Sequence, residues 1–237
     1  MNSISAVLTN PLTRRVAALV LVAAGSFAQE KAKPPVPAAK PAAATAAPEQ
    51  KYKANVKGPA NAPIKVVEFA DFMCPGCQAA SRALREYFAQ QGDDINLTFK
   101  NFPLEKACNP GIGQTVHNGA CELALGSICA AELGMFWPYH DRIFSRSWEV
   151  ASRQDVIDNG VAVGMDKMKF AACLASPAAS SKLAVQVKEG FEVKVEVTPT
   201  LVVNGRKLAA TNQFSSAIEE ERKKLAGAAP PAAPTKK

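Results

Sequence analysis

The sequence IKVVEFADFMCPGC, residues 64–77, joins an apolar and β-branched run to two cysteines three positions apart. The run at 64–70 is typical of a buried central strand, whereas the residues from Gln78 to Gln91 carry apolar side chains at helical spacing. Cysteines at this spacing occupy one helical turn, so their sulfur atoms can meet in a small disulfide ring. The stretch therefore predicts a strand, a reactive cysteine pair and a helix that act as one unit.

The first cysteine of the pair is expected at the N-terminus of the helix, where unpaired N–H groups and the helix dipole favour a thiolate. Pro75 suits a first helical position, because the N–H that it lacks would have had no helical partner. Cys74 is therefore the expected nucleophile and leaving group, and Cys77 the more protected resolving thiol. Half of a zinc site and a purely structural disulfide are the alternatives, although the other four cysteines contain no second C-x-x-C.

A carboxylate interrupts the apolar run six residues before Cys74, at Glu68. A buried carboxylate is costly and its pKa is usually raised, which suits a proton acceptor beside a thiol. Glu68 is therefore a candidate catalytic residue. The alternative is that its side chain points to solvent.

Residues 1–28 have the pattern of a secretion signal, with a basic region, an apolar stretch and a small-residue cleavage site at Ala28. The apolar stretch is far shorter than the roughly 20 residues of a membrane span, so we expect cleavage, with an uncleaved anchor as the alternative. Export places the six cysteines in an oxidising compartment, and the bacterial periplasm is the expected one.

Two segments rich in Ala, Pro and Lys bound the folded part. Residues 29–53 predict a flexible linker, and residues 226–237 predict a disordered tail of the same composition. One domain with a substantial core is expected at residues 54–225. The net charge of +7 comes mostly from the signal, the linker and the tail, so the folded part is nearly neutral and gives no reason to expect a nucleic-acid partner.

The rest of the domain alternates strand and helix signals. Residues 95–99 predict a second strand, and strand–helix–strand order implies a right-handed crossover and a parallel pair. Strand signals return at 200–203, followed by Asn204-Gly205 as a hairpin turn and a last amphipathic helix at about 213–225. Between these parts, residues from about 113 to 193 predict an inserted helical subdomain, with helices at 116–133, 136–144, 154–163, 167–174 and 178–193.

The two histidines have no obvious partner motif. We expect His117 and His140 to be surface or helix-packing residues, and neither is a catalytic candidate. The second belongs to a group of aromatic residues expected to pack as one face: Trp137, Tyr139, His140 and Phe144.

The four other cysteines, Cys108, Cys121, Cys129 and Cys173, allow three pairings. Cys121 and Cys129 lie about 12 Å apart along one predicted helix, whereas a disulfide needs Cα atoms within about 7 Å. That spacing excludes Cys121–Cys129 and its complement Cys108–Cys173. Two pairings stay open, as does a role for these cysteines as a second shuttle pair.

Two motifs and the helical insertion together resemble the thioredoxin superfamily, and within it the DsbA-like thiol–disulfide oxidoreductases. The motifs are V-V-E-F-A-D-F-M-C-P-G-C at 66–77 and V-T-P-T-L-V-V-N-G at 197–205. The resemblance covers nearly all of residues 64–225 and implies a thioredoxin-like α/β fold, with a central mixed sheet and an inserted helical subdomain. It also implies that Glu68 is the buried acid that relays protons.

The resemblance implies a substrate-binding side formed by Pro199, Thr198, Pro75 and Gly76. Pro199 matches a cis-proline that faces the active disulfide, and Thr198 matches a residue that contacts the substrate backbone. No metal and no cofactor beyond the Cys74–Cys77 disulfide is implied. The dipeptide departs from the C-P-H-C of the strongest oxidases, whose histidine helps to stabilise the thiolate, so a less oxidising site is expected and the direction of electron flow stays open.

The resemblance also favours one cysteine pairing. Cys129–Cys173 resembles a helix–helix disulfide of actinobacterial DsbA-like proteins. That choice leaves Cys108–Cys121 to tie the loop after Phe102 to the start of a helix.

The resemblance leads us to expect a monomeric oxidoreductase that exchanges disulfides with reduced or unfolded secreted proteins. Phe72 and Met73 are expected to expose apolar surface that holds these substrates. The sequences at 102–109 and 137–144 are similar to thioredoxin-like partners of bacterial vitamin K epoxide reductase homologues. A quinone-linked membrane reoxidase, either such a homologue or a DsbB-like protein, is thus the expected recycling partner. A reductase or isomerase fed by a membrane electron donor and a non-catalytic envelope chaperone or binding module are the alternatives.

Overall fold

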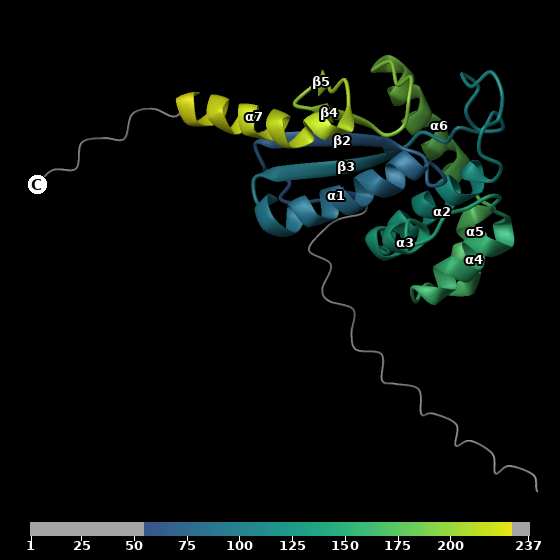
Figure 1. The fold of residues 1–237 in the computed structure, drawn as a ribbon. Coiled ribbons are helices and arrows are strands. Elements are labelled where there is room, and N and C mark those ends of the chain that lie inside the picture. Colours follow the sequence, from purple (N-terminus) through teal and green to yellow (C-terminus); the bar gives the residue numbers. More distant parts are fainter. Residues whose placement is uncertain (1–54, 229–237) are drawn as a thin grey trace, which may run out of the picture. The chain divides into compact units, whose positions relative to one another are not determined.

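The computed structural model describes residues 55–228, so the expected signal at 1–28, the linker at 29–53 and most of the expected tail lie outside the described residues. The described chain forms a five-stranded sheet of order β1-β3-β2-β4-β5 (Figure 1). β2 and β3 are parallel and the other neighbouring strands are antiparallel, which confirms the expected mixed sheet. The strands are β1 (Val56–Lys57), β2 (Ile64–Ala70), β3 (Ile95–Asn101), β4 (Thr200–Val203) and β5 (Arg206–Lys207).

The parallel pair follows from the β2–α1–β3 connection, in which α1 (Pro75–Gln91) carries the chain back to the start of the sheet. β2 is hydrogen-bonded to β3 on one edge and to β4 on the other, so it is the central strand. Most of the side chains of β2 are buried, and Glu68 is held inside the protein with the apolar residues around it.

The C-terminal part of the domain supplies β4 and β5, the strands on the other side of β2 from β3. Asn204 and Gly205 have φ angles of 44° and 83°, as the expected hairpin turn between β4 and β5 requires. A short 3₁₀ helix, η1 (Thr211–Gln213), leads into α7 (Phe214–Ala228), which packs beside α1 with the rings of Tyr87 and Phe214 5.1 Å apart. This helix was predicted to end at residue 225, but it continues to Ala228, into the expected tail.

Five helices form the expected insertion, and Figure 1 shows them gathered at one end of the sheet. The first was predicted to begin at residue 116, which is wrong. Gly119 has a φ of 98° and lies so close to Ala151 that a Cβ would be 2.0 Å from its carbonyl oxygen, so the helix begins only after it. No helix among residues 55–228 is long and apolar enough to cross a membrane. The five are α2 (Ala120–Glu132), α3 (Phe136–Ile143), α4 (Arg153–Ala162), α5 (Lys167–Leu174) and α6 (Pro177–Glu192).

The aromatic residues of α3 pack together, as expected, and they lie against Phe99 of β3. The ring of His140 lies 5.2 Å from that of Phe99 and 4.9 Å from that of Phe144, and burial lowers the pKa of His140. His140 is therefore a core residue, which confirms the packing role expected for it.

Two disulfides fix the insertion, with the pairing that the resemblance favoured. Cys129 of α2 is bonded to Cys173 of α5, and Cys108 is bonded to Cys121 at the start of α2. The first therefore joins two helices, and the second ties the loop after β3 to the insertion.

Removal of the Cys129–Cys173 disulfide should be the more destabilising of the two removals. The Cys129–Cys173 disulfide closes a loop of 44 residues, whereas Cys108–Cys121 closes a loop of 13. If restriction of the unfolded chain is the main effect, the free energies of unfolding should fall by about 4 and about 3 kcal/mol. Urea unfolding of the two paired cysteine-to-alanine variants measures both values, and the opposite order would show that native packing dominates.

Candidate active site

The two cysteines of the motif lie where β2 passes into α1. Cys74 is the N-cap residue of α1 and Pro75 is its first residue, as the sequence predicted. Cys74 is half-buried, Cys77 is buried, and neither is bonded in a disulfide. In the part of the chain that the structure describes, no group of three or more His, Cys, Asp or Glu residues could hold a metal ion.

The two thiols have opposite pKa shifts. Hydrogen bonds lower the pKa of Cys74 to about 5: the bond with the Cys77 side chain contributes most, and the backbone N–H groups of Cys77 and Gly76 contribute less. Burial raises the pKa of Cys77 well above its usual value. At neutral pH the site therefore presents one reactive thiolate at the accessible sulfur, above a protonated and protected thiol.

The proline loop before β4 faces this pair. The bond between Thr198 and Pro199 is cis, as expected, and the Sγ of Cys74 lies 3.3 Å from the carbonyl oxygen of Thr198. A Cβ on Gly76 would lie 3.3 Å from the Cδ of Pro199 and 3.6 Å from the Sγ of Cys74. The structure thus brings together the residues that the sequence assigned to the substrate-binding side.

Glu68 lies beneath the pair, in the middle of β2. Its side chain is buried, so the solvent-facing alternative is wrong, and burial raises its pKa to about 8. Its Oε1 has no hydrogen-bond partner among the described residues. A cavity of about 10 Å³ lies beside Glu68 and Ser81, which is room for about one water molecule.

Sequence reasoning missed two site residues, Asp71 and His117. The side chain of Asp71 is fully buried, and its Oδ2 lies 2.9 Å from the Nδ1 of His117. His117 is therefore not the surface or packing residue that was expected. The Asp71 position was visible between the strand and the cysteines, but nothing local to either residue predicts a contact across 46 positions.

The expected exposure of Phe72 and Met73 is also wrong, because both side chains are buried. The ring of Phe72 lies 5.1 Å from that of Phe99 and 4.8 Å from that of Phe144. Tyr139 and His140 of α3 also lie against the ring of Phe72, so the insertion helps to bury that ring.

Apolar surface near the thiols is provided by two neighbouring grooves. One, of about 400 Å³, runs between α1 and α7, and the other, of about 270 Å³, follows the cis-proline loop. Because Leu201 and Thr211 line both, the grooves adjoin beside the motif. Further lining residues include Gly76, Ala83, Tyr87 and Phe214 in the first groove, and Val197, Pro199 and Leu208 in the second.

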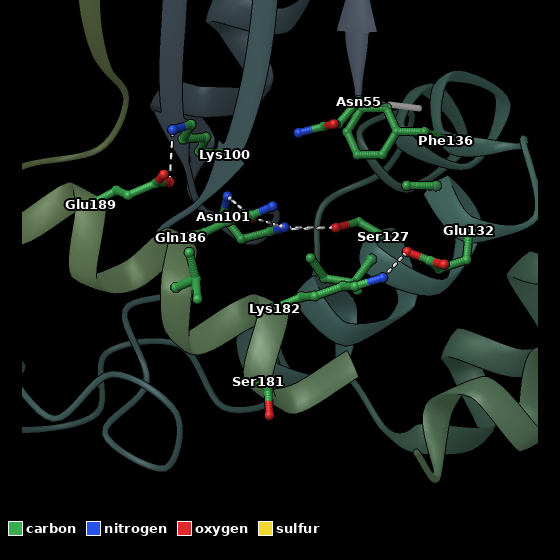
Figure 2. Close-up of a pocket in the computed structure, with 13 residues that line it drawn as sticks. Asn55, Lys100, Asn101, Ser127, Glu132, Phe136, Ser181, Lys182, Gln186 and Glu189 are labelled. Atoms are coloured by element: carbon green, nitrogen blue, oxygen red, sulfur yellow. Dashed lines mark hydrogen bonds and ion pairs between the residues drawn. The ribbon is translucent and has the colours of Figure 1, made fainter. Parts of the chain in front are cut away.

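A larger cavity, of about 590 Å³, lies between α2, α6 and β3, and none of the motif or proline-loop residues lines it (Figure 2). The Nδ2 of Asn101 bonds to Ser127 at 2.9 Å and to Gln186 at 2.8 Å, so these polar groups satisfy one another. The charged side chains are paired as well. The two ion pairs are Lys100–Glu189 and Lys182–Glu132.

The cysteine pair lies at the start of a helix and faces a cis-proline, in a fold with a mixed sheet and a helical insertion. These features define a thiol site of the thioredoxin-fold class. The chain belongs to the thioredoxin family, since the family model described as Thioredoxin matches residues 50–220.

Solved structures share this fold. The chain is similar to a thioredoxin-like oxidoreductase from Silicibacter pomeroyi (20% identity, 71% of this chain and 91% of that one, TM-score 0.60). It is also similar to BdbD from Bacillus subtilis (21% identity, 73% and 93%, TM-score 0.60). It matches part of the Na⁺/H⁺ antiporter NhaA of Herminiimonas arsenicoxydans, at 29% identity over 65% of this chain and 23% of that protein. The chain thus spans about a quarter of the length of the curated relatives it matches.

Proposed function

We propose that this protein is a DsbA-type thiol–disulfide oxidoreductase that exchanges disulfides with secreted proteins in the periplasm. The observation that carries the proposal is the asymmetry of the pair. The accessible Cys74 has a pKa of about 5, whereas the pKa of the buried Cys77 is raised. Cys74 is a good leaving group because its pKa is low. The buried, protonated Cys77 competes poorly with a second substrate thiol for the mixed disulfide. Both properties favour transfer of the disulfide from the enzyme to the substrate.

The exchange proceeds in two steps. A substrate thiolate attacks the Sγ of Cys74 in the Cys74–Cys77 disulfide, which forms a mixed disulfide and releases Cys77 as a thiolate. A second substrate thiolate then attacks the substrate sulfur of the mixed disulfide and displaces Cys74 as a thiolate. The substrate dithiol loses two electrons and becomes a disulfide, while the enzyme's cysteine pair gains them.

Glu68 supplies the proton that the first step needs. Its pKa of about 8 leaves it mostly protonated at neutral pH, and its charge is among the causes that raise the pKa of Cys77. Cys77 leaves as a strongly basic thiolate, so it takes a proton from Glu68. The small cavity beside Ser81 gives Glu68 room to exchange that proton through one water molecule.

The substrate lies across the two adjoining grooves beside the motif. Backbone groups of Thr198 and Pro199 align it as an extended segment, and the apolar groove walls hold side chains of varied sequence. Such contacts give broad specificity, as a catalyst for many secreted chains needs.

Features of the sequence support the proposed compartment and recycling partner. The signal pattern at 1–28 supports export to the periplasm, and the segments at 102–109 and 137–144 support a quinone-linked membrane reoxidase as the protein that restores the disulfide. The Pro75-Gly76 dipeptide supports a second candidate, a reductase fed by a membrane electron donor, because it lacks the histidine of the strongest oxidases.

The reduction potential of the Cys74–Cys77 pair tests the direction of exchange. Equilibration with glutathione buffers, read by alkylation of the two thiols, should give a potential between about −120 and about −200 mV, because the thiolate is stabilised. A value near −270 mV, like that of thioredoxin, would instead support the reductase. Failure of the pair to exchange with glutathione at all would overturn both candidates.

A further inference from the structure

An ion pair that the exchange steps do not use lies beside the thiols. His117 comes from the loop between β3 and α2, and its Nδ1 lies 2.9 Å from the Oδ2 of Asp71. The side chain of Asp71 is fully buried, whereas that of His117 is 18% exposed. The imidazole therefore keeps access to solvent protons while its carboxylate partner is fixed inside the protein.

Asp71 connects this ion pair to both cysteines. Its carbonyl oxygen accepts a hydrogen bond from the backbone N–H of Cys74 at 3.1 Å, and its own N–H donates to the Sγ of Cys77 at 3.4 Å. Its Oδ1 accepts from the N–H of Met73 at 2.7 Å. Because one residue bonds to both cysteines and to the chain before them, His117 is held at a fixed place relative to the thiols.

Two negative groups act on His117. The hydrogen bond with Asp71 raises its pKa, and the charge of the Cys74 thiolate raises it further. Glu105, the carboxylate in the loop that carries His117, accepts hydrogen bonds from the N–H groups of Gly119 and Cys121 instead. A coupling between two sites is reciprocal, so a thiolate that favours the imidazolium is itself favoured by it.

We propose that His117, fixed by Asp71, sets the redox equilibrium of the cysteine pair by stabilising the reduced Cys74 thiolate with an imidazolium charge. The inference rests on the proposed function, in that the pair must cycle between dithiol and disulfide. A substrate dithiol gives up two electrons and two protons when it reduces the disulfide. Cys77 gains one proton by way of Glu68, which is then reprotonated, and the other passes to His117 or to solvent while Cys74 remains a thiolate.

The direct test is a pH titration of the histidine ring signals by NMR in the oxidised and the reduced protein. The chain has only two histidines, and the buried His140 serves as an internal reference. Reduction should strengthen proton binding to His117 by at least about threefold, because a thiolate charge appears beside it. The titration uses unmodified protein, oxidised chemically if necessary, so it does not depend on a variant that folds or on activity.

A variant series tests the effect on the thiols. His117→Gln should shift the glutathione equilibrium at least about threefold toward the disulfide, which makes the potential about 14 mV more negative. His117→Lys should restore the wild-type potential at neutral pH. At higher pH the lysine should still stabilise the Cys74 thiolate, whereas the neutral imidazole of the wild type no longer does. Lys182→Gln, which removes a positive charge from the separate cavity of Figure 2, is the matched control and should leave the potential unchanged.

The two proposals fail in different ways. Equal proton affinity of His117 in both redox states would overturn the role of His117, even if the pair exchanges with glutathione normally. An unchanged potential in a folded His117→Gln variant would do the same. If the unmodified pair does not exchange with glutathione, the proposed function fails, whatever the titration of His117 shows.

Discussion

A Cys74→Ser variant is expected to lose disulfide exchange by more than about 1,000-fold, because a hydroxyl cannot form the mixed disulfide on which both steps depend. The accessible position of Cys74 and its lowered pKa make it the only one of the two thiols suited to attack by substrate. The rate at which the oxidised enzyme converts a reduced, unfolded protein to its disulfide form measures this loss.

Cys77→Ser is the matched variant for that experiment. It keeps the reactive Cys74 but removes the resolving thiol, so a mixed disulfide with oxidised glutathione should accumulate instead of being released. Full activity in Cys74→Ser would show that the pair is structural, and would favour the non-catalytic chaperone or binding module.

Glu68→Gln is expected to remove a large pH dependence of stability. Burial raises the pKa of Glu68 from 4.5 to about 8, so the folded state holds this proton more tightly than the unfolded state. The stability that the protonated Glu68 contributes is therefore fully present below pH 4.5 and is lost as the pH rises to about 8. A pKa raised from 4.5 to about 8 corresponds to a loss on the order of 5 kcal/mol.

Urea unfolding at a series of pH values from about 4 to 9 checks this result. Both proteins are kept oxidised, because the thiols of Cys74 and Cys77 would otherwise titrate in the same range. The difference in unfolding free energy between wild type and Glu68→Gln should become less favourable to the wild type as the pH rises. A difference that does not change with pH would mean that Glu68 is ionised in the folded protein or reaches solvent.

The parts of the site that lie close together in the sequence were predictable. The apolar run of β2 and the periodicity of α1 placed Cys74 at a helix N-terminus, because strand and helix patterns are local properties of the chain. The cis-proline and the disulfide pairing came from the family resemblance, since neither follows from spacing alone.

The parts that depend on tertiary contacts were not predictable in the same way. Phe72 and Met73 have the apolar character of groove residues, and only the tertiary packing of the folded chain decides that they are buried. The contact between Asp71 and His117 joins two loops, so no periodicity encodes it. β1 has two residues, which is too short for an alternating pattern to appear.

The central position of β2 decides which of the two reacting chains loses conformational entropy. β2 is held by neighbours on both edges, and the cysteine turn begins directly after it, so the catalyst is already ordered before it meets a substrate. The entropy lost in forming the mixed disulfide then comes almost wholly from the other chain. Under the proposed function, a rigid, folded protein cannot bring a cysteine into such a site, whereas an unfolded chain can, so the site would select substrates by their flexibility.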